Sequence, residues 1–150
     1  MRHGKAVQAD GLADRERPLT PRGRRDCEMI APAIAQDYRP DRILCSPVLR
    51  TRETLAAMLP GIGEVSDIRF LEELYDHPGD YAGVISANGR ESERLLVIGH
   101  NPGLEDLVDM LTGVQRPLKT SSIAVLSSRF GWAAAGVRWG RLDSTVTPRG

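Results

Sequence analysis

Three short stretches of the sequence carry side chains that could do chemistry together. Arg2-His3-Gly4 stands at the start, Arg50 follows a Cys-Ser-Pro stretch, and His100 stands in Gly-His-Asn-Pro. Histidine can act as a nucleophile or a proton carrier near neutral pH. The planar fork of arginine binds phosphate oxygens in pairs. Two His and two Arg that converge on one crevice would therefore form a pocket for a phosphoryl group.

The elements expected around these residues would bring them together. Residues Arg42–Cys45 and Arg94–Gly99 read as buried apolar strands, and a helix is expected after each of them. Ligands of open α/β sheets gather beyond the carboxyl ends of the strands, so Arg50 and His100 are expected at one edge of the sheet. The glycine after His3 is expected to allow the close backbone approach that a bulky anion needs.

Further sequence patterns predict helices and strands that alternate along the chain. Thr20-Pro21 predicts a capped helix start, Pro32 predicts a kink or an early end of that helix, and Ser46-Pro47 predicts the start of a second helix. Further expected elements are a strand at 67–70, a short helix at 80–87, a helix that ends at Gly113, and late strands at 122–126 and 136–139. The order favours one domain, residues 1–150, with a three-layer α/β/α architecture and a mostly parallel central sheet.

Composition argues against several classes of protein. The 150 residues include 20 basic and 20 acidic side chains, so no net charge favours nucleic acid or an anionic membrane as a partner. No apolar run approaches the roughly 20 residues that cross a bilayer, and the start lacks a signal-peptide pattern. Cys27 and Cys45 lack the spacing of a metal site and are expected to be buried thiols in a reducing compartment. We expect a cytoplasmic monomer.

Four segments give the chain a resemblance to a known family. Arg2-His3-Gly4, Glu16–Asp26, Ile43–Thr54 and Val97–Gly113, in this order, resemble the histidine phosphatase superfamily with its phosphoglycerate-mutase-like fold. Within it, the chain is most similar to the short phosphohistidine phosphatases of the SixA type. The resemblance implies a phosphatase without a sizeable cap over its pocket.

The resemblance also implies roles for individual residues. His3 would be the nucleophile that becomes phosphorylated, while Arg2, Arg50 and His100 would bind the phosphoryl group and offset its charge. These side chains would supply the positive charge that a metal ion would otherwise provide, so no metal and no other cofactor is expected. Arg50 could instead be a structural residue paired with Glu53.

The general acid is less clearly indicated than the nucleophile. Larger members of the family carry a Glu near a cap insertion; in the corresponding segment, Leu71–Gly83, Glu73 matches best and Asp76 is next. A weak acid and an open pocket suit phosphohistidine in a protein, because imidazole is a better leaving group than an alkoxide. The alternatives are a phosphomonoesterase of small molecules and a pocket that binds phosphorylated partners without turnover.

One departure from the family concerns the start of the chain. The family places a hydrophobic strand before Arg-His-Gly, and here only Met1 precedes Arg2. The first core strand is therefore expected to be missing or truncated, with His3 on a frayed end. Either the true start lies upstream or the sheet is incomplete.

Overall fold

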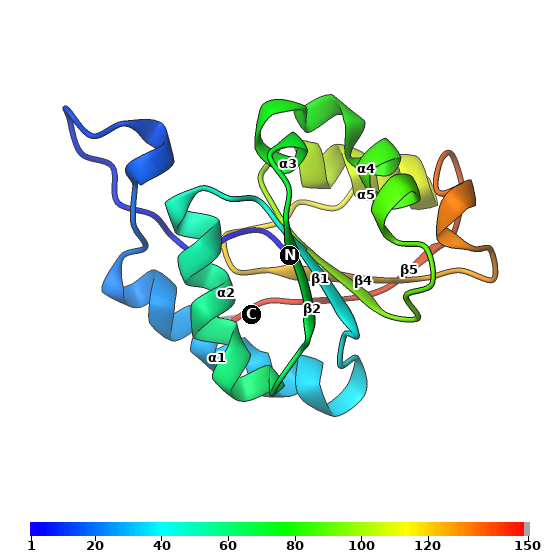
Figure 1. The fold of residues 1–150 in the computed structure, drawn as a ribbon, viewed down its shortest axis with the longest axis horizontal. Helices are drawn as coiled ribbons and strands as arrows, with labels where there is room; N and C mark the ends of the chain where they lie inside the picture. Colours follow the sequence, from blue (N-terminus) through cyan, green and yellow to red (C-terminus); the bar gives the residue numbers. More distant parts are fainter. Residues whose placement is uncertain (149–150) are drawn as a thin grey trace.

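A computed structural model describes residues 1–148, and its helices cover both faces of a central sheet (Figure 1). Helices α1 (Pro21–Asp37) and α2 (Leu49–Ile62) lie on one side. Helices α4 (Tyr81–Asn88) and α5 (Gly103–Thr112) lie on the other. This is the α/β/α arrangement that the alternation of elements predicted. Within residues 1–148, no helix is both long enough and apolar enough to span a bilayer.

The parallel part of the sheet has three strands. Strand β1 (Arg42–Cys45) lies between β2 (Asp67–Phe70) and β3 (Leu95–Ile98), and both pairings are parallel. The first two strands have the predicted bounds. The short helix α3 (Glu73–Asp76) follows β2 and leads toward α4.

A second, antiparallel pair consists of β4 (Ile123–Ser127) and β5 (Arg141–Val146). Antiparallel late strands were predicted, but the second was placed at 136–139, and that position is wrong. Trp139 is instead a buried residue of the turn before β5, where its ring stacks on that of Trp132 at 5.0 Å between centroids. In so short a stretch, the sequence does not distinguish a strand from a turn whose aromatic side chain is buried.

Alternation along β1 divides the core into two halves. Ile43 and Cys45 are buried with residues of α1 and α2, whereas Leu44 is buried with residues of α4 and α5. Successive side chains of a strand point to opposite faces, so a strand covered on both sides is apolar throughout. Cys27 and Cys45 are free and buried, as expected.

Residues Met1–His3 act as a short strand between the two parts of the sheet. Arg2 forms a parallel bridge with Gly99, and its amide donates to the carbonyl of Ser122 at 3.0 Å. The amide of His3 donates to the carbonyl of Gly99 at 3.2 Å, and Met1 is buried. The frayed end that the sequence suggested is not what the structure shows. His3 is held by backbone bonds on both sides.

Two local expectations about helices are also corrected. Helix α1 continues past Pro32, because Pro32 and Glu28, whose carbonyl loses its helical donor, both lie on the solvent face. Helix α2 begins at Leu49 rather than at Ser46-Pro47, and Ser46 is fully buried. The hydroxyl of Ser46 serves the site described below instead of capping a helix.

Candidate active site

A cleft of about 640 Å³ opens beyond the carboxyl ends of β1, β3 and the Met1–His3 segment. Arg2 and His3 belong to the Met1–His3 segment, Arg50 lies in the first turn of α2 after β1, and His100 follows β3. They meet in the cleft because parallel strands end at the same edge of a sheet. The cleft is lined by Arg2, His3, Gln8, Arg17, Arg50, Tyr75, Asp76, Pro78, His100, Asn101 and Pro102.

The ring of His3 is oriented by its own neighbour. Its Nδ1 lies 2.7 Å from the carbonyl oxygen of Gly4, an acceptor, so Nδ1 carries the proton and donates. Nε2 is then the unprotonated nitrogen with a free lone pair. Burial lowers the pKa of His3 to about 4, together with the positive charges of Arg50, Arg2 and Arg17 and against the opposing hydrogen bond to Gly4. His3 is therefore neutral at pH 7.

His100 faces His3, with 5.2 Å between the ring centroids. Its Nε2 lies 2.8 Å from the hydroxyl of Ser46, and its backbone amide donates to the hydroxyl of Tyr81 at 3.1 Å. Burial, then the proximity of His3 and Arg50, lowers the pKa of His100 to about 3. His100 is thus a neutral donor in this cleft, whereas the sequence suggested a positive charge.

Arg2 and Arg50 enter the cleft from two sides and are both fixed. Arg2 donates through Nη1 to the carbonyl of Leu118 at 2.9 Å. The guanidinium of Arg50 spans Asp14, donating to its carbonyl at 2.8 Å and to its carboxylate at 3.0 Å. Thr54 ties the two regions together, because its hydroxyl accepts from the amide of Gly4 and donates to the carbonyl of Arg50.

Unpartnered polar atoms gather around this cleft. Within residues 1–148, the buried side-chain polar atoms without a hydrogen-bond partner are Nε of Arg2, Nε of Arg50, Nδ1 of His100 and Oδ1 of Asn101. All four belong to residues that line the cleft. Buried polar groups normally have partners, so orphaned nitrogens of Arg2, Arg50 and His100 at one cleft indicate a place for an anion with several acceptor oxygens.

Tyr75 lines the cleft and Asp14 lies behind it, bonded to Tyr75 and Arg50; neither residue was singled out in the sequence. The Tyr75 hydroxyl donates to the Asp14 carboxylate at 2.6 Å, and Arg17 donates to its other oxygen at 3.0 Å. These bonds, with that of Arg50, hold the pKa of Asp14 well below its usual range. The edge of the Tyr75 ring approaches His100, with 5.5 Å between centroids.

The two carboxylates proposed as general acid lie differently. Asp76 lines the cleft and forms an ion pair with Arg15 at 3.3 Å, while Glu73 is exposed and does not line it. Glu72, beside Glu73, pairs with the same Arg15. If a carboxylate donates a proton here, its position favours Asp76.

The structure bears on two expectations from the sequence, one about Gly4 and one about the partner of Arg50. A Cβ on Gly4 would lie 3.0 Å from the carbonyl of Gly23 and 3.0 Å from the sulfur of Cys27. The glycine is therefore needed for close packing against α1, a role that the sequence did not suggest. Glu53 pairs with Arg24 at 3.0 Å, so the alternative partner considered for Arg50 is engaged elsewhere.

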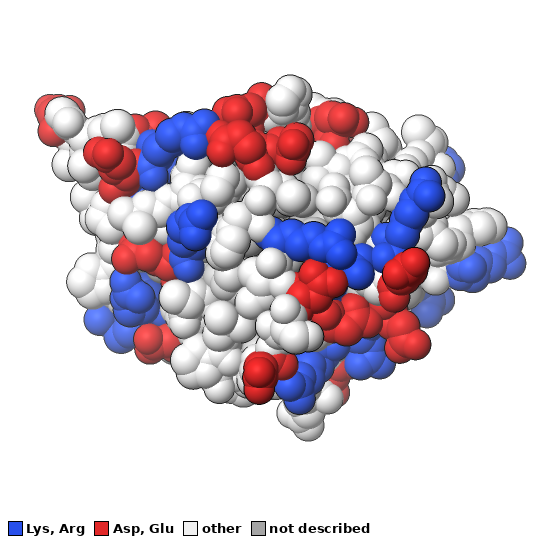
Figure 2. All heavy atoms as spheres, viewed as in Figure 1, with Lys and Arg blue, Asp and Glu red and all other residues white. Residues whose placement is uncertain are grey.

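Sequence reasoning missed several of the lining residues, Arg17 among them. Arginine accounts for 18 of the 20 basic residues, so a single Arg carries little information, and its spacing from other residues does not distinguish Arg17. Asn101 and Pro102 adjoin His100 and could have been found from that position. The charges on the face shown in Figure 2 are mixed, blue beside red, so this face carries no broad basic surface.

Comparison with known proteins agrees with this geometry. The model of the histidine phosphatase superfamily (branch 1) matches residues 1–111. The chain belongs to the histidine phosphatase superfamily. Among curated relatives, this phosphatase chain is 34% identical over 146 residues to the uncharacterized protein Rv1276c of Mycobacterium tuberculosis, covering 89% of this chain and 90% of the relative. It is 28% identical over 174 residues to an uncharacterized chloroplastic protein of Arabidopsis thaliana, At3g52155, covering 99% and 76%.

Solved structures of the SixA type resemble the histidine phosphatase chain over almost its whole length. SixA from Agrobacterium tumefaciens has 30% identity and a TM-score of 0.83 over 99% of this chain and 95% of that one. A protein histidine phosphatase SixA complexed with tungstate has 28% identity and a TM-score of 0.82 over 99% and 95%. Phosphoserine phosphatase of Entamoeba histolytica, at 14% identity and a TM-score of 0.67, shares the fold. The resemblance read from the four sequence segments is confirmed.

Proposed function

We propose that the chain hydrolyses phosphohistidine in a protein, through a phosphorylated His3 and without a metal. The observation that carries the proposal is the set of orphaned donors on Arg2, Arg50 and His100 around the ring of His3. Three donors suit the three non-bridging oxygens of a phosphoryl group. Nε2 of His3 lies in the same cleft and is available as the nucleophile. The tungstate of one SixA structure supports the proposal, because tungstate is a tetrahedral oxyanion like phosphate.

In the first step, Nε2 of His3 attacks phosphorus, a new N–P bond forms, and the N–P bond of the substrate breaks. His3 is suited to this step because its Nδ1 proton is held by Gly4 and its Nε2 lone pair is free. Phosphorylated His3 carries a positive imidazolium, which the carbonyl of Gly4 stabilises. In the second step, water attacks phosphorus and His3 leaves as the same neutral tautomer, releasing phosphate.

The leaving group favours phosphohistidine over an alkyl phosphate. A phosphorylated imidazole whose second nitrogen carries a proton departs as neutral imidazole and needs no acid. An alkoxide needs a proton as it leaves. Asp76, the carboxylate that lines the cleft, forms an ion pair with Arg15, which makes it a weak source of a proton for a leaving oxygen. This supports a substrate whose leaving group carries its own proton.

Substrate comparison tests the proposal. We expect kcat/KM for a phosphohistidine peptide to exceed that for glycerol phosphate or a phosphoserine peptide by about 100-fold or more, the usual scale of missing general acid catalysis. Arg50→Lys keeps the charge but loses the fork and should slow turnover of every substrate. Faster turnover of the small phosphate esters would favour a phosphomonoesterase, and binding of phosphate with no turnover would favour a binding pocket.

A further inference from the structure

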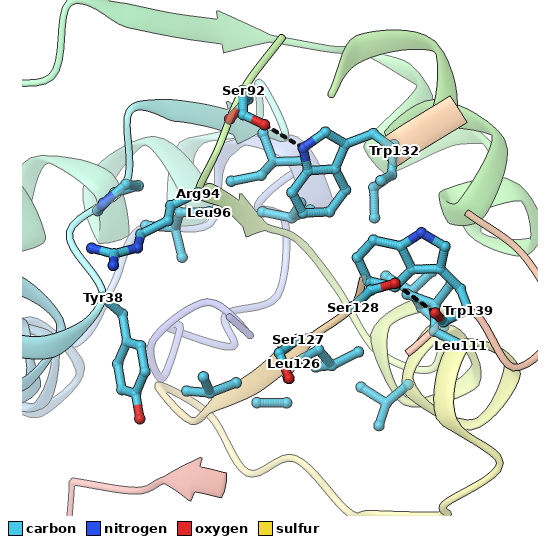
Figure 3. A pocket seen from close by; sticks show the side chains of 18 of the residues that line it. Tyr38, Ser92, Arg94, Leu96, Leu111, Leu126, Ser127, Ser128, Trp132 and Trp139 are labelled. Atoms are coloured by element: carbon cyan, nitrogen blue, oxygen red, sulfur yellow. Dashed lines mark hydrogen bonds between the residues drawn. The ribbon is translucent and has the colours of Figure 1, made fainter. Parts of the chain in front are cut away.

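Polar groups around the second cavity of the molecule have partners, unlike several of those at the active-site cleft. This cavity, of about 740 Å³, lies between β3 and β4 and is lined largely by apolar residues (Figure 3). The indole N–H of Trp132 donates to the carbonyl of Ser92 at 2.6 Å, and the hydroxyl of Ser128 donates to the carbonyl of Trp139 at 2.6 Å. None of the orphaned buried side-chain atoms of residues 1–148 belongs to this lining, so the unmet hydrogen bonds of buried side chains lie at the active site.

One of the four orphaned atoms at the active-site cleft is an acceptor. Oδ1 of Asn101 is buried, has no hydrogen-bond partner in the described part of the chain, and belongs to a residue that lines the cleft. The other three atoms are nitrogens of Arg2, Arg50 and His100, which a bound phosphoryl group would satisfy. The oxygens of a phosphoryl dianion only accept hydrogen bonds, so the anion leaves Asn101 unpaired. Because a buried acceptor without a donor is unfavourable, Oδ1 points to a second chemical group in the cleft, one that carries a donor.

The orientation of the Asn101 amide is fixed by its nitrogen. Nδ2 donates to the carbonyl of Leu118 at 2.9 Å, and since a carbonyl can only accept, the nitrogen and not the oxygen must face Leu118. Arg2 donates to the same carbonyl through Nη1, also at 2.9 Å. Leu118 is itself held through its amide, which donates to the carboxylate of Glu105 at 3.3 Å. The side chains of Arg2 and Asn101 therefore meet at one oxygen, and this wall of the cleft presents both an unmet donor and an unmet acceptor.

We propose that Asn101 selects substrates phosphorylated on nitrogen, its Oδ1 accepting a hydrogen bond from the N–H of the leaving group. The proposal rests on the phosphohistidine hydrolysis proposed above and names the residue that recognises the imidazole. As the P–N bond breaks, its electron pair passes to the ring nitrogen and the ring loses its positive charge. The proton stays on the second ring nitrogen, hydrogen-bonded to Oδ1, because an amide oxygen is too weak a base to remove it near neutral pH.

Phosphate esters would lack this contact. The leaving group of an ester departs through oxygen and brings no N–H to Oδ1 of Asn101, so the buried acceptor stays unpaired. A site built to hydrogen-bond an N–H or O–H discriminates strongly against an analogue without it. Asn101 thus adds a preference for N-phosphorylated substrates that is separate from the ease with which the leaving group departs.

The test compares two substrates that both have good leaving groups. A phosphohistidine peptide carries the N–H, whereas 4-nitrophenyl phosphate lacks it and needs little help from an acid. Asn101→Ala should lower kcat/KM for the peptide by about 10- to 100-fold, the usual effect of losing a hydrogen bond to a charged group. It should change kcat/KM for 4-nitrophenyl phosphate by less than about threefold. Asn101→Ser, which also removes Oδ1 but stays polar, should show the same loss of selectivity and replaces Asn101→Ala if that variant does not fold.

Asn88→Ala is the matched control. Asn88 also donates through Nδ2 to a carbonyl, that of Val84 at 2.9 Å, and it does not line the cleft, so both rates should stay unchanged. Inhibition by inorganic phosphate controls for the bond that Asn101→Ala loses to Leu118. The inhibition constant should change by less than about threefold in this variant, because the phosphoryl site itself is intact.

Three results would overturn the proposal. Equal losses with both substrates would mean that Oδ1 acts on a step common to both, such as the attack of water on phosphorylated His3. An unchanged rate with the phosphohistidine peptide would show that Asn101 does not contact the leaving group. A phosphate inhibition constant that rises in step with the loss of activity would make Asn101 a support for Arg2. Failure of the proposed function has a different signature: the unaltered chain would hydrolyse glycerol phosphate faster than the peptide, and the proposal about Asn101 would fall with it.

Discussion

The Nε2 atom of His100 lies 2.8 Å from the hydroxyl oxygen of Ser46, and this contact engages Nε2 and leaves Nδ1 as the nitrogen without a partner. The Ser46 hydroxyl can donate to Nε2, which leaves the proton of a neutral ring on Nδ1, the orphaned atom. His3 carries its proton on Nδ1 as well, through Gly4. The two rings therefore differ in role: His100 presents an N–H donor, whereas His3 presents a nitrogen lone pair.

The first prediction follows from this pair of tautomers. In ¹⁵N NMR spectra of the ligand-free protein, His3 and His100 should both be Nδ1-protonated neutral rings down to about pH 5, because burial lowers their pKa values to about 4 and about 3. Added phosphate should raise the pKa of His100, since a nearby anion favours the charged form. Protonation of either ring near pH 6.5 without ligand would contradict the assignment.

Ser46→Ala gives the second prediction. The variant removes the contact that selects the tautomer of His100, so kcat should fall by roughly tenfold with phosphohistidine peptide as substrate. Ser86→Ala is the matched control, because Ser86 is distant from the cleft lining and bonds only to the carbonyl of Ala133 among the described residues. An unchanged kcat with a changed tautomer in the NMR spectrum would show that His100 is not a donor to the phosphoryl group.

Asp14→Asn gives the third prediction and concerns the positioning of Arg50. The Asp14 carboxylate accepts from Nη2 of Arg50 and from the Tyr75 hydroxyl, so loss of its charge should loosen Arg50, which keeps the bond from Nη1 to the Asp14 backbone carbonyl. We expect kcat/KM to fall by about 10- to 100-fold. Asp143→Asn, which disturbs only an ion pair with the exposed Arg141, is the control. Higher activity of Asp14→Asn would mean that Asp14 competes with substrate for Arg50.

The fourth prediction separates the two carboxylates. Asp76→Asn should slow any turnover of alkyl phosphates and leave the phosphohistidine rate within about threefold, because only the alkoxide needs an acid. Glu73→Gln should change neither rate, since Glu73 is exposed and does not line the cleft. A strong effect of Glu73→Gln on ester hydrolysis would show that α3 moves when substrate binds.

The fifth prediction concerns stability and pH. Met1, His3 and His100 have folded-state pKa values of about 5, 4 and 3, each below its ordinary value. The unfolded chain therefore binds more protons than the folded chain, and stability falls as pH falls, from about pH 8 for Met1 and from about pH 6.5 for the histidines. Tm should drop by more than about 10 °C between pH 8 and pH 4.

Acetylation of the α-amine isolates the share of Met1 in this pH dependence. The acetylated chain should lose the dependence between pH 8 and pH 6.5 and, below pH 6.5, should keep only the part that belongs to His3 and His100. A Tm that still falls between pH 8 and pH 6.5 after acetylation would contradict the buried position of this group.

The sequence predicted the elements that present the site better than the contacts within it. Strand β1 and the positions of Arg50 and His100 followed from apolar runs that end in Ser-Pro and Gly-His, because these patterns are local. Gly113 ends α5 in a left-handed conformation, as its position indicated. The network of Asp14 could not be predicted, because it joins a surface loop to α2 and α3 across distances in sequence that no local pattern encodes.

Nonlocal packing also explains why two elements were predicted at the wrong positions. Ser46-Pro47 has the composition of a helix cap, but the Ser46 side chain turns inward to His100 and the helix starts two residues after Pro47. Trp139 has strand propensity, yet stacking on Trp132 holds it in a turn. In both cases a tertiary contact outweighs a local preference.

The central claim is that His3 becomes phosphorylated during turnover, and trapping tests it most directly. Enzyme mixed with ³²P-phosphoramidate and quenched at alkaline pH should carry an acid-labile label that maps to His3. His77→Ala, a change at an exposed histidine outside the cleft lining, should trap the same label, and His3→Ala should trap none. A label on His100 or Ser46, or turnover that persists in His3→Ala, would contradict the account.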